Sequence, residues 1–273
     1  VLAGGKGVVV TTDLQEATEF INESIQTDGH VLLESFLPGE EASMLVVMDA
    51  SGFVCLPPSQ DHKRVWDGDK GLNTGGMGAY CPAPVVTEEI HHKVLERIVK
   101  PMHESLSRMD VPYRGVLYVG LMIDENGDPF VVEFNVRFGD PECQVTLPLI
   151  ASDVGELLFS AATDALGNHS VSFHDKHCLT VVLASEGYPQ SAIKNRLILG
   201  AELADDGHNV WVSHAGTGIN DSNQLISTGG RVLSTTAIAP SLSDARALSY
   251  QRMEKISLQG SHHRNDIGYR ALR

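Results

Sequence analysis

The twelve residues VVEFNVRFGDPE, residues 131–142, carry the most informative pattern in the chain. Side chains of a β-strand alternate between two faces, so Glu133, Asn135 and Arg137 are predicted to share one face. The apolar residues between them are predicted to face the core: Val132, Phe134 and Val136. An unpaired buried carboxylate or guanidinium costs several kcal/mol, which is comparable with the net stability of a domain. The polar row therefore requires solvent, ion partners or a ligand.

A β-hairpin is predicted around this row. Residues 115–124, GVLYVGLMID, form the partner strand, the turn is ENGD, and the returning strand covers 129–138. A solvent-exposed strand face with internal ion pairs is one interpretation of the polar row. We favour a functional row, because Mg²⁺ usually takes one or two side-chain oxygens and completes its coordination with water and substrate phosphates. Glu133 and Asn135 suit that role.

The rest of the chain mixes strands and helices, which predicts an α+β protein. The start is predicted to be a β-α-β unit, with strands at 6–12 and 30–37 and a helix at 13–25. Further predicted elements are a hairpin over 41–59, helices at 87–106, 152–166 and 241–256, and strands at 178–189, 209–217 and 224–239. Residues 167–177 are polar and poor in helix formers, so we expect a boundary between domains 1–170 and 171–273.

The composition is that of a globular protein with room for two cores, since 273 residues are 42% hydrophobic and 20% charged. Four scattered cysteines without a CxxC pair favour a reducing compartment, which predicts a cytoplasmic protein. No apolar run reaches the roughly 18 residues of a membrane span, so no membrane partner is expected. The formal net charge of -15 makes nucleic acid an unsuitable partner, because it repels a phosphate backbone.

Two glycine-rich stretches are candidates for anion binding, because glycine lets backbone N–H groups approach a phosphate closely. LAGGKG places Gly4, Gly5 and Gly7 around Lys6, although it is not a P-loop and an ordinary glycine-rich turn is the alternative. The loop of residues 60–78 is the second stretch, with a solvated surface loop as its alternative. Its candidate residues are Asp61, Lys63, Arg64, Asn73, Gly75 and Gly76.

Taken together, eight motifs resemble those of the phosphoribosylamine-glycine ligases, a family of the ATP-grasp superfamily. They are LAGGKGVVV, ESFLPGEEAS, QDHKRVWDGDKGLNTGGMGAYCPAP, GLMIDENG, VVEFNVRFGDPE, HAGT, GGRVL and RNDIGYRA. The resemblance implies an ATP-grasp fold, in which two α+β lobes grip ATP, followed by a small α+β C-terminal domain. It implies a purine-biosynthesis ligase that joins glycine to 5-phosphoribosylamine through glycyl phosphate, giving glycinamide ribonucleotide, ADP and phosphate.

The resemblance also implies roles for individual residues. Glu133 and Asn135 would hold Mg²⁺ or Mn²⁺ against the phosphates of ATP. The implied contacts of ATP are Gly4, Gly5, Lys6, Gly7, Glu34, Phe36, Leu37 and Glu41. The implied catalytic residues are Arg137, Asp140, Lys63 and Arg64. The implied contacts of phosphoribosylamine and glycine are Asp61, Lys63, Arg64, Asn73, Gly75, Gly76, Arg137, Asp140 and Glu142, with Asp140 and Glu142 at the rim of the site.

The chain departs from the family pattern in three places. Many superfamily members have a further acidic metal ligand where this chain has Gly120, so two protein ligands are expected. Family members usually begin with a Rossmann-like domain and a strand that bears an ATP-binding lysine, whereas this sequence begins at Val1. We therefore expect this stretch alone to bind Mg-ATP weakly and to ligate poorly. Val136 replaces the usual cysteine, but on a core-facing position this changes little.

Two other functions stay open at this point. One is another purine-pathway ATP-grasp ligase or carboxylase, against which the DHKR and NTGGMGAY motifs argue. The other is a nucleotide-binding module without catalysis. For the ligase, the expected partners are its small-molecule substrates glycine, 5-phosphoribosylamine and ATP, together with other enzymes of purine synthesis.

Overall fold

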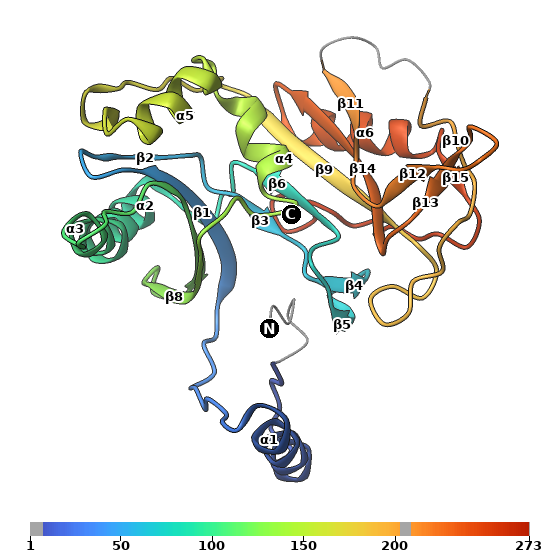
Figure 1. The fold of residues 1–273 in the computed structure, drawn as a ribbon, viewed down its shortest axis with the longest axis horizontal. Helices are drawn as coiled ribbons and strands as arrows, with labels where there is room; N and C mark the ends of the chain where they lie inside the picture. Colours follow the sequence, from blue (N-terminus) through green and yellow to red (C-terminus); the bar gives the residue numbers. More distant parts are fainter. Residues whose placement is uncertain (1–7, 203–208, 273) are drawn as a thin grey trace.

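The computed structural model describes residues 8–202 and 209–272. Its first layer is an antiparallel sheet with the strand order β2-β1-β7-β8 (Figure 1). The strands are β1 (Glu40–Met48), β2 (Phe53–Cys55), β7 (Gly115–Ile123) and β8 (Pro129–Asn135). The strand β8, which carries the polar row, therefore lies at an edge of this sheet.

The second sheet combines strands from both sides of residue 170, in the order β11-β14-β9-β6-β3. Its strands are β3 (Gln60–Asp61), β6 (Gly78–Cys81), β9 (His177–Ala184), β11 (Val210–His214) and β14 (Arg231–Ala239). The N-terminal strand β6 pairs with β9, where Cys81 lies opposite Cys178. The loop between β3 and β6 is thus held against the C-terminal part of the chain. It contains five of the predicted substrate residues: Lys63, Arg64, Asn73, Gly75 and Gly76.

Short two-stranded ribbons complete the strand inventory. They are β4 (Arg64–Trp66) with β5 (Lys70–Asn73), β10 (Ile198–Leu199) with β15 (Ser257–Leu258), and β12 (Thr217–Ile219) with β13 (Leu225–Ser227). The predicted C-terminal part contained three strands and a helix, so the short ribbons there were missed. Strands of two or three residues leave too short an apolar pattern to recognise.

Helices cover both faces of the first sheet. One continuous helix consists of α2 (Glu88–Val94), a π-helical turn (Leu95–Val99) and α3 (Lys100–Ser107), and it confirms the helix predicted at 87–106. It buries one face of the sheet, including Met44 and Val119. The other face packs against α5 (Val154–Ala162), through residues such as Leu45 and Tyr118. Figure 1 shows these helices on opposite sides of β1 and β2.

Two further helices follow in the chain. The short α4 (Cys143–Thr146) comes directly after the polar motif and continues into a 3-10 turn (Leu147–Leu149); a second 3-10 turn covers Leu166–Asn168. The helix predicted at 241–256 is confirmed as α6 (Leu242–Met253). It packs on β9 and β14 through Leu242, Ala245 and Met253. This helix therefore closes the core of the second sheet.

The predicted hairpin of the polar motif is confirmed, but its second strand ends at Asn135 rather than at 138. A register shift beside Gly120 also leaves Val132 without a direct partner, as in a β-bulge. The prediction that Val132, Phe134 and Val136 face the core is wrong, because these side chains are 41%, 37% and 73% exposed. Val132 and Phe134 lie on an edge strand, whereas Val136 lies beyond the end of that strand. The chain has left the sheet there, so the alternation of strand faces no longer applies to Val136 or Arg137.

The predicted β-α-β start is confirmed only for its helix, α1 (Leu14–Asp28). Residues 30–38 form no strand, although Leu32, Leu33 and Phe36 give the segment an apolar pattern. All three side chains are more than 70% exposed, because no neighbouring strand within the described part of the chain pairs with them. Residues 8–12 likewise form no strand, and the first part of that prediction lies outside the described residues.

Candidate functional site

The polar row of β8 begins the site. Glu133 lies opposite Gly120, and Asn135 lies opposite Tyr118. Directly opposed residues of an antiparallel pair share a face, so both side chains lie on the same sheet face as Tyr118, the face that α5 covers. Within residues 8–202 and 209–272, the side-chain oxygens of Glu133 and Asn135 accept no hydrogen bond. These oxygens are therefore available to a cation.

A cluster of carboxyl groups surrounds Lys63 beside this face. The Nζ atom of Lys63 lies 2.7 Å from Oε2 of Glu41, and Asp61 and Glu142 are buried. Burial, followed by the charge of Glu142, raises the pKa of Asp61, and burial also raises the pKa of Glu142. Burial disfavours the charged form of Lys63, but Asp61 and Glu41 outweigh it and raise the pKa of this lysine. With more carboxyl groups than ammonium groups, the cluster favours a positively charged ligand.

Two residues that the sequence did not single out connect this cluster to the sheet. The hydroxyl oxygens of Ser43 and Tyr118 are 2.8 Å apart, and Ser43 also donates to a carboxylate oxygen of Glu142 at 3.4 Å. Glu142 was expected at the rim, which is wrong, because only 4% of it is exposed. Ser43 and Tyr118 hold it beneath the sheet face. Tyr118 was recognisable in principle, since the hairpin turn sets the register that places it opposite Asn135.

The glycine loop and the polar motif meet at an arginine of β14. Nη1 of Arg231 donates to the carbonyl oxygens of Gly75 and Asp140, each at 2.8 Å, and lies 3.2 Å from the Asp140 carboxylate. The backbone N–H of Gly75 donates to the hydroxyl of Tyr188 at 3.0 Å. The structure thus brings Gly75, Gly76 and Asp140 together, through two C-terminal side chains to which the sequence assigned no role. The signal for Arg231 was its motif, GGRVL.

A cavity of about 550 Å³ adjoins the loop of residues 60–78. Two predicted substrate residues, Arg64 and Asn73, line it. These two residues lie opposite each other in the β4–β5 hairpin. Nη1 of Arg64 donates to the Gly71 carbonyl oxygen at 2.7 Å. The other walls are Val8, Val9, Val10, Glu16, Leu72, Pro189 and Gln190. The walls of this cavity therefore come from three parts of the chain: the N-terminal segment, the β4–β5 hairpin and the C-terminal part.

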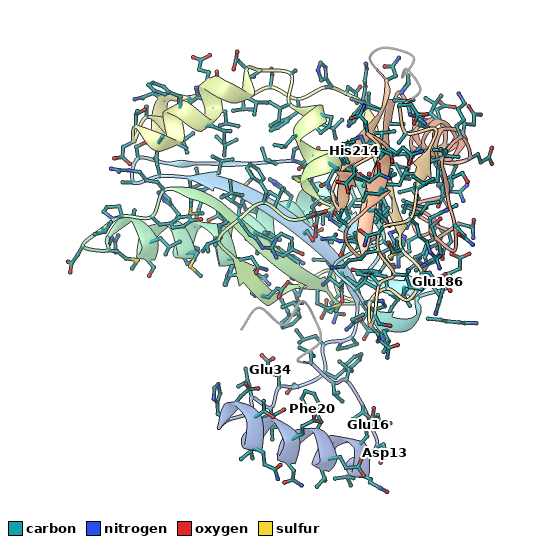
Figure 2. All side chains as sticks on the ribbon, turned by 45° about the vertical axis from the view of Figure 1, so that its right-hand side comes forward. Asp13, Glu16, Phe20, Glu34, Glu186 and His214 are labelled. Carbon is teal, nitrogen blue, oxygen red and sulfur yellow. The ribbon has the colours of Figure 1, made fainter. Side chains whose placement is uncertain are left out.

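The predicted ATP contacts do not form one group. Gly4, Gly5, Lys6 and Gly7 lie outside the described residues. Glu34 and Phe36 are exposed on the extended segment after α1, where Figure 2 shows Glu34 apart from the body of the molecule, while Leu37 is half-buried. Glu41, in contrast, reaches the cluster around Lys63.

The predicted catalytic residue Arg137 also stands apart from the buried cluster. It is exposed, and its Nη1 atom donates to the carbonyl oxygen of its neighbour Phe138 at 2.9 Å. The strand has ended before this residue, so strand alternation does not place its guanidinium beside Glu133 and Asn135.

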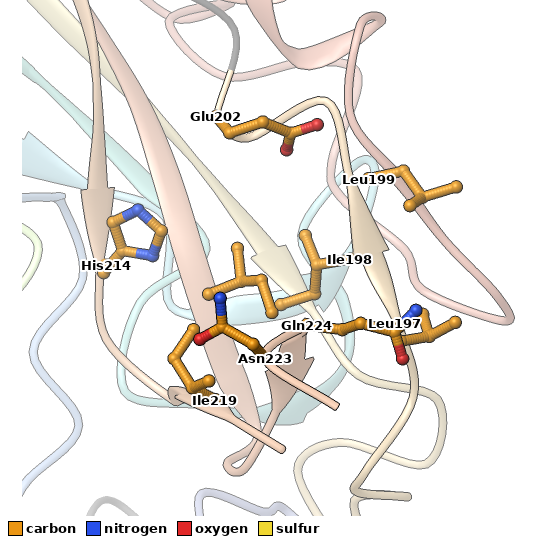
Figure 3. A pocket seen from close by; sticks show the side chains of 9 residues that line it. Leu197, Ile198, Leu199, Glu202, His214, Ile219, Asn223 and Gln224 are labelled. Carbon is orange, nitrogen blue, oxygen red and sulfur yellow. The ribbon is translucent and has the colours of Figure 1, made fainter. Parts of the chain in front are cut away.

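A second cavity, of about 470 Å³, lies in the C-terminal part of the chain. Figure 3 shows His214 of β11 and Glu202 at its wall, with Ile198 of β10 and Ile219 of β12 around it. Among its described wall residues there is no predicted site residue. The described walls of this cavity therefore include no residue of the site around β8 and Lys63.

Neither a ready-made metal cluster nor a membrane helix is found in the described residues. No three His, Cys, Asp or Glu side chains of 8–202 and 209–272 are placed to hold a metal together. No helix in these same residues has the length and apolar character needed to cross a membrane. A metal ion at Glu133 and Asn135 would thus need other oxygens, such as those of phosphates.

Sequence comparisons identify related proteins. Models of phosphoribosylglycinamide synthetase match the chain twice, with the ATP-grasp (A) domain over residues 1–143 and the C domain over residues 178–270. The phosphoribosylamine–glycine ligase of Vibrio parahaemolyticus is 42% identical and that of Leptospira interrogans 43%, each over 99% of this chain. The chain spans 64% of the length of each of these relatives.

Solved structures give the same relationship. The phosphoribosylamine–glycine ligase of Thermotoga maritima matches with a TM-score of 0.84 at 32% identity, over 98% of this chain and 67% of that one. The biotin carboxylase domain of Hydrogenobacter thermophilus 2-oxoglutarate carboxylase, solved with MgADP, ADP and bicarbonate, matches with a TM-score of 0.69 at 18% identity. That match covers 95% of this chain and 56% of the other. The predicted α+β ATP-grasp fold is therefore confirmed.

Proposed function

The chain belongs to the phosphoribosylglycinamide synthetase family, and from this we propose that it is the ATP-grasp and C-terminal part of an ATP-dependent ligase. The ligase joins glycine to 5-phosphoribosylamine and gives glycinamide ribonucleotide, ADP and phosphate. Because the chain spans only 64% of its curated relatives, the activity is proposed for the whole protein. Its scattered free cysteines support a reducing compartment, and we propose the cytoplasm.

One observation carries the proposal. The polar face of β8, with Glu133 and Asn135, lies beside Lys63 and its carboxyl neighbours, of which Asp61 and Glu142 are buried. The geometry shows this proximity, because Tyr118 lies opposite Asn135 and its hydroxyl is 2.8 Å from that of Ser43, which donates to Glu142. Glu133 also contributes to the raised pKa of Lys63. A ligase of this kind needs a metal-binding face for ATP next to a charged site for two small polar substrates, and the position of Glu133 and Asn135 beside the group around Lys63 supports the proposal.

Mg²⁺ or Mn²⁺ fits the first part of the site. Glu133 and Asn135 offer a carboxylate and an amide oxygen that accept no hydrogen bond within the described residues. Such hard oxygens suit Mg²⁺, which usually takes one or two protein ligands and completes its coordination with water and phosphate. When bound, the ion would offset the negative charge of the ATP phosphates. Glu41 would meet the ribose of ATP, with Glu34, Phe36 and Leu37 near adenine.

The loop residues supply the proposed phosphoribosylamine site. Arg64 and Asn73 line the 550 Å³ cavity, where a guanidinium is suited to a sugar phosphate. Lys63 and Asp61 lie at the carboxyl-rich end, which favours an amine. Gly75 and Gly76 belong to the same loop. We propose that the phosphate of the substrate lies toward Arg64 and its amine toward Asp61.

Glycine binding is assigned to the polar motif. Asp140 and Glu142 would receive the ammonium group of glycine, and Arg137 its carboxylate. The γ-phosphoryl group of ATP then passes to this carboxylate, which yields glycyl phosphate and ADP. The amine of phosphoribosylamine attacks the glycyl carbonyl carbon, a C–N bond forms, the amine loses a proton and phosphate departs.

The test compares two variants of one hairpin. Glu133→Gln removes the proposed metal ligand, whereas Glu125→Gln changes an exposed residue in the turn of the same hairpin. Glycine-dependent ADP formation in the presence of phosphoribosylamine should fall by roughly 10²–10³ in Glu133→Gln, as loss of one preorganised charged group typically does. Glu125→Gln should retain wild-type turnover. Equal turnover in both variants would remove the metal assignment.

The same assay separates the other functions. ADP release that depends on bicarbonate and not on glycine would identify a carboxylase, which is the second candidate ATP-grasp activity. ATP binding by calorimetry without ADP release under any substrate would identify a nucleotide-binding module. Glycine-dependent ADP release that also requires phosphoribosylamine supports the ligase alone.

A further inference from the structure

The C-terminal segment, residues 264–270, packs against the β4–β5 hairpin, residues 64–73, almost 200 positions earlier in the sequence. The central contact is Arg264, whose side chain is fully buried. Its Nε and Nη2 atoms donate to the two carboxylate oxygens of Asp266 at 2.7 and 2.8 Å. Its Nη1 atom donates to Asp69 at 2.8 Å and to the carbonyl oxygen of Arg64 at 3.1 Å. One buried guanidinium thus connects the first residue and the turn of the hairpin to the C-terminal segment.

The turn of the hairpin makes further contacts with the same segment. Asp67 accepts from the backbone N–H and the side-chain amide of Asn265 at 2.8 and 3.0 Å. The N–H of Gly68 donates to Asp266 at 2.8 Å. Asp69 also accepts from the side chains of two residues near the end of the chain, Tyr269 and Arg270. The acidic residues of the turn are therefore bound by the C-terminal segment.

The C-terminal segment is itself fixed to α6. The hydroxyl of Tyr250 donates to the Arg264 carbonyl oxygen at 2.7 Å and accepts from the N–H of Ile267 at 3.1 Å. Arg246 donates to the carbonyl oxygens of Asn265 and Ile267 at 2.6 and 3.0 Å. Because α6 packs on the second sheet, the segment is part of a rigid layer.

The hairpin carries residues of the proposed phosphoribosylamine site at both ends. Arg64 begins β4, Asn73 ends β5, and Lys63 directly precedes the hairpin. Across its open end, Lys63 accepts at its carbonyl oxygen from the N–H of Thr74 at 2.8 Å. A two-stranded hairpin is only marginally stable alone, so its position depends on what it packs against.

We propose that Arg264 is a positioning residue for phosphoribosylamine: it holds the β4–β5 hairpin in place, so that Lys63, Arg64 and Asn73 are preorganised for this substrate. The inference rests on the proposed function. It adds that phosphoribosylamine binding requires the C-terminal segment, residues 264–270. We expect ATP binding to change little, because the proposed metal ligands Glu133 and Asn135 lie on a different sheet.

The test uses the protein as its gene encodes it, with two variants and a matched control. Arg264→Lys keeps the charge but loses the planar fork that serves four acceptors. Asp69→Asn removes the carboxylate charge that the hairpin presents to Arg264, and it leaves Arg264 paired with Asp266 and with the carbonyl oxygen of Arg64. The control is Arg252→Lys, because Arg252 is also a buried arginine of the C-terminal part, bound to the carbonyl oxygens of Gly200 and Ala201.

Two measurements are made on each variant. The KM for phosphoribosylamine should rise about 10-fold in Arg264→Lys and Asp69→Asn, with the KM for ATP within about twofold of wild type, since one substrate site is affected. Backbone amides of residues 64–73 should exchange hydrogen faster in both variants without any substrate, while those of β9 keep their rates. Arg252→Lys should show neither change.

The proposal is overturned if exchange in the hairpin is unchanged, if both KM values rise equally, or if Arg252→Lys gives the same pattern. A wild-type protein without glycine-dependent ADP release would instead refute the proposed function. The exchange measurement needs no substrate, so in that case it still decides whether Arg264 fixes the hairpin.

Discussion

The two ends of the described chain differ in a way that their sequences do not suggest. The N-terminal segment, residues 8–39, contains several large apolar side chains, yet Leu14 is 84% and Phe36 72% exposed. The C-terminal segment is polar, yet Arg264 is fully buried there. Burial thus follows from the partners that a segment finds rather than from its own hydrophobicity.

Local signals explain the helix of the N-terminal segment. Asp13 caps α1 by accepting from the backbone N–H groups of Gln15 and Glu16, and Gly29 ends it in the left-handed conformation. No residue of α1 is buried, and Figure 2 shows Asp13, Glu16 and Phe20 on a helix that stands away from the two sheets. The helix is therefore formed by local interactions, whereas the C-terminal segment is formed by tertiary ones.

The largest effect is expected when the buried charge of the C-terminal segment is removed. Arg264→Met should lower the free energy of unfolding by about 3–5 kcal/mol, because it leaves Asp266 and Asp69 without their buried partner. Urea unfolding of the 273-residue chain measures this. A loss below about 1 kcal/mol would mean that the network around Arg264 adds little beyond surface ion pairs.

The difference between locally formed and tertiary-stabilised segments also explains which parts of the fold the sequence predicted. Strand alternation predicted the hairpin of β7 and β8, and local sequence patterns predicted the helices α1 and α6, because these elements depend on nearby residues. The strand predicted at 30–37 failed because a strand requires a neighbour, and pairing is not encoded in its own pattern. The pairing of β6 with β9 across about 100 residues was likewise beyond local reasoning.

The site shows the same difference between what local sequence patterns predict and what depends on distant parts of the chain. Glu133 and Asn135 were found from their spacing and lie on one face, as predicted. The roles assigned to them, to Lys63 and to Arg64 remain predictions, of which Glu133→Gln tests the first. Ser43, Tyr118, Tyr188 and Arg231 were missed, because each joins the site through contacts between distant parts of the chain.

A matched pair of isoleucines tests the contrast for apolar residues. Ile267 in the C-terminal segment is fully buried, whereas Ile25 in α1 is 49% exposed. Ile267→Ala should lower the free energy of unfolding by about 3 kcal/mol through lost burial and a cavity. Ile25→Ala should change it by less than about 0.5 kcal/mol. Similar losses in urea unfolding would show that α1 packs as tightly as the C-terminal segment.

Acid should destabilise the folded protein through His62, whose Nε2 atom accepts from the N–H of Gly268 in the C-terminal segment at 3.4 Å. Burial, and the charges of Arg264 and Arg270, lower the pKa of His62 to about 3. An unfolded histidine titrates near pH 6.5, so between these values the unfolded state binds the extra proton. The stabilising contribution is complete above about pH 6.5 and is lost as pH falls toward 3, at up to about 1.4 kcal/mol per pH unit.

The measurement is the slope of unfolding free energy against pH between 6 and 4. His62→Gln should flatten this slope, because glutamine does not titrate. His30→Gln, which changes an exposed histidine of the N-terminal segment, should leave the slope of wild type. A wild-type slope in the His62 variant would exclude this histidine as a source of acid sensitivity.

The smallest predicted effect compares the two helix caps. Ser241 accepts from the N–H of Asp244 at 3.1 Å at the start of α6, and Asp13 accepts from that of Gln15 at 2.8 Å at the start of α1. Removing an N-cap typically lowers stability by about 1 kcal/mol, but only where the helix unfolds together with the core. Ser241→Ala should therefore lower the global free energy of unfolding by about this amount. Asp13→Ala should instead reduce helical circular dichroism slightly and leave the urea midpoint unchanged, whereas a shifted midpoint would show that α1 unfolds as one unit with the two sheets.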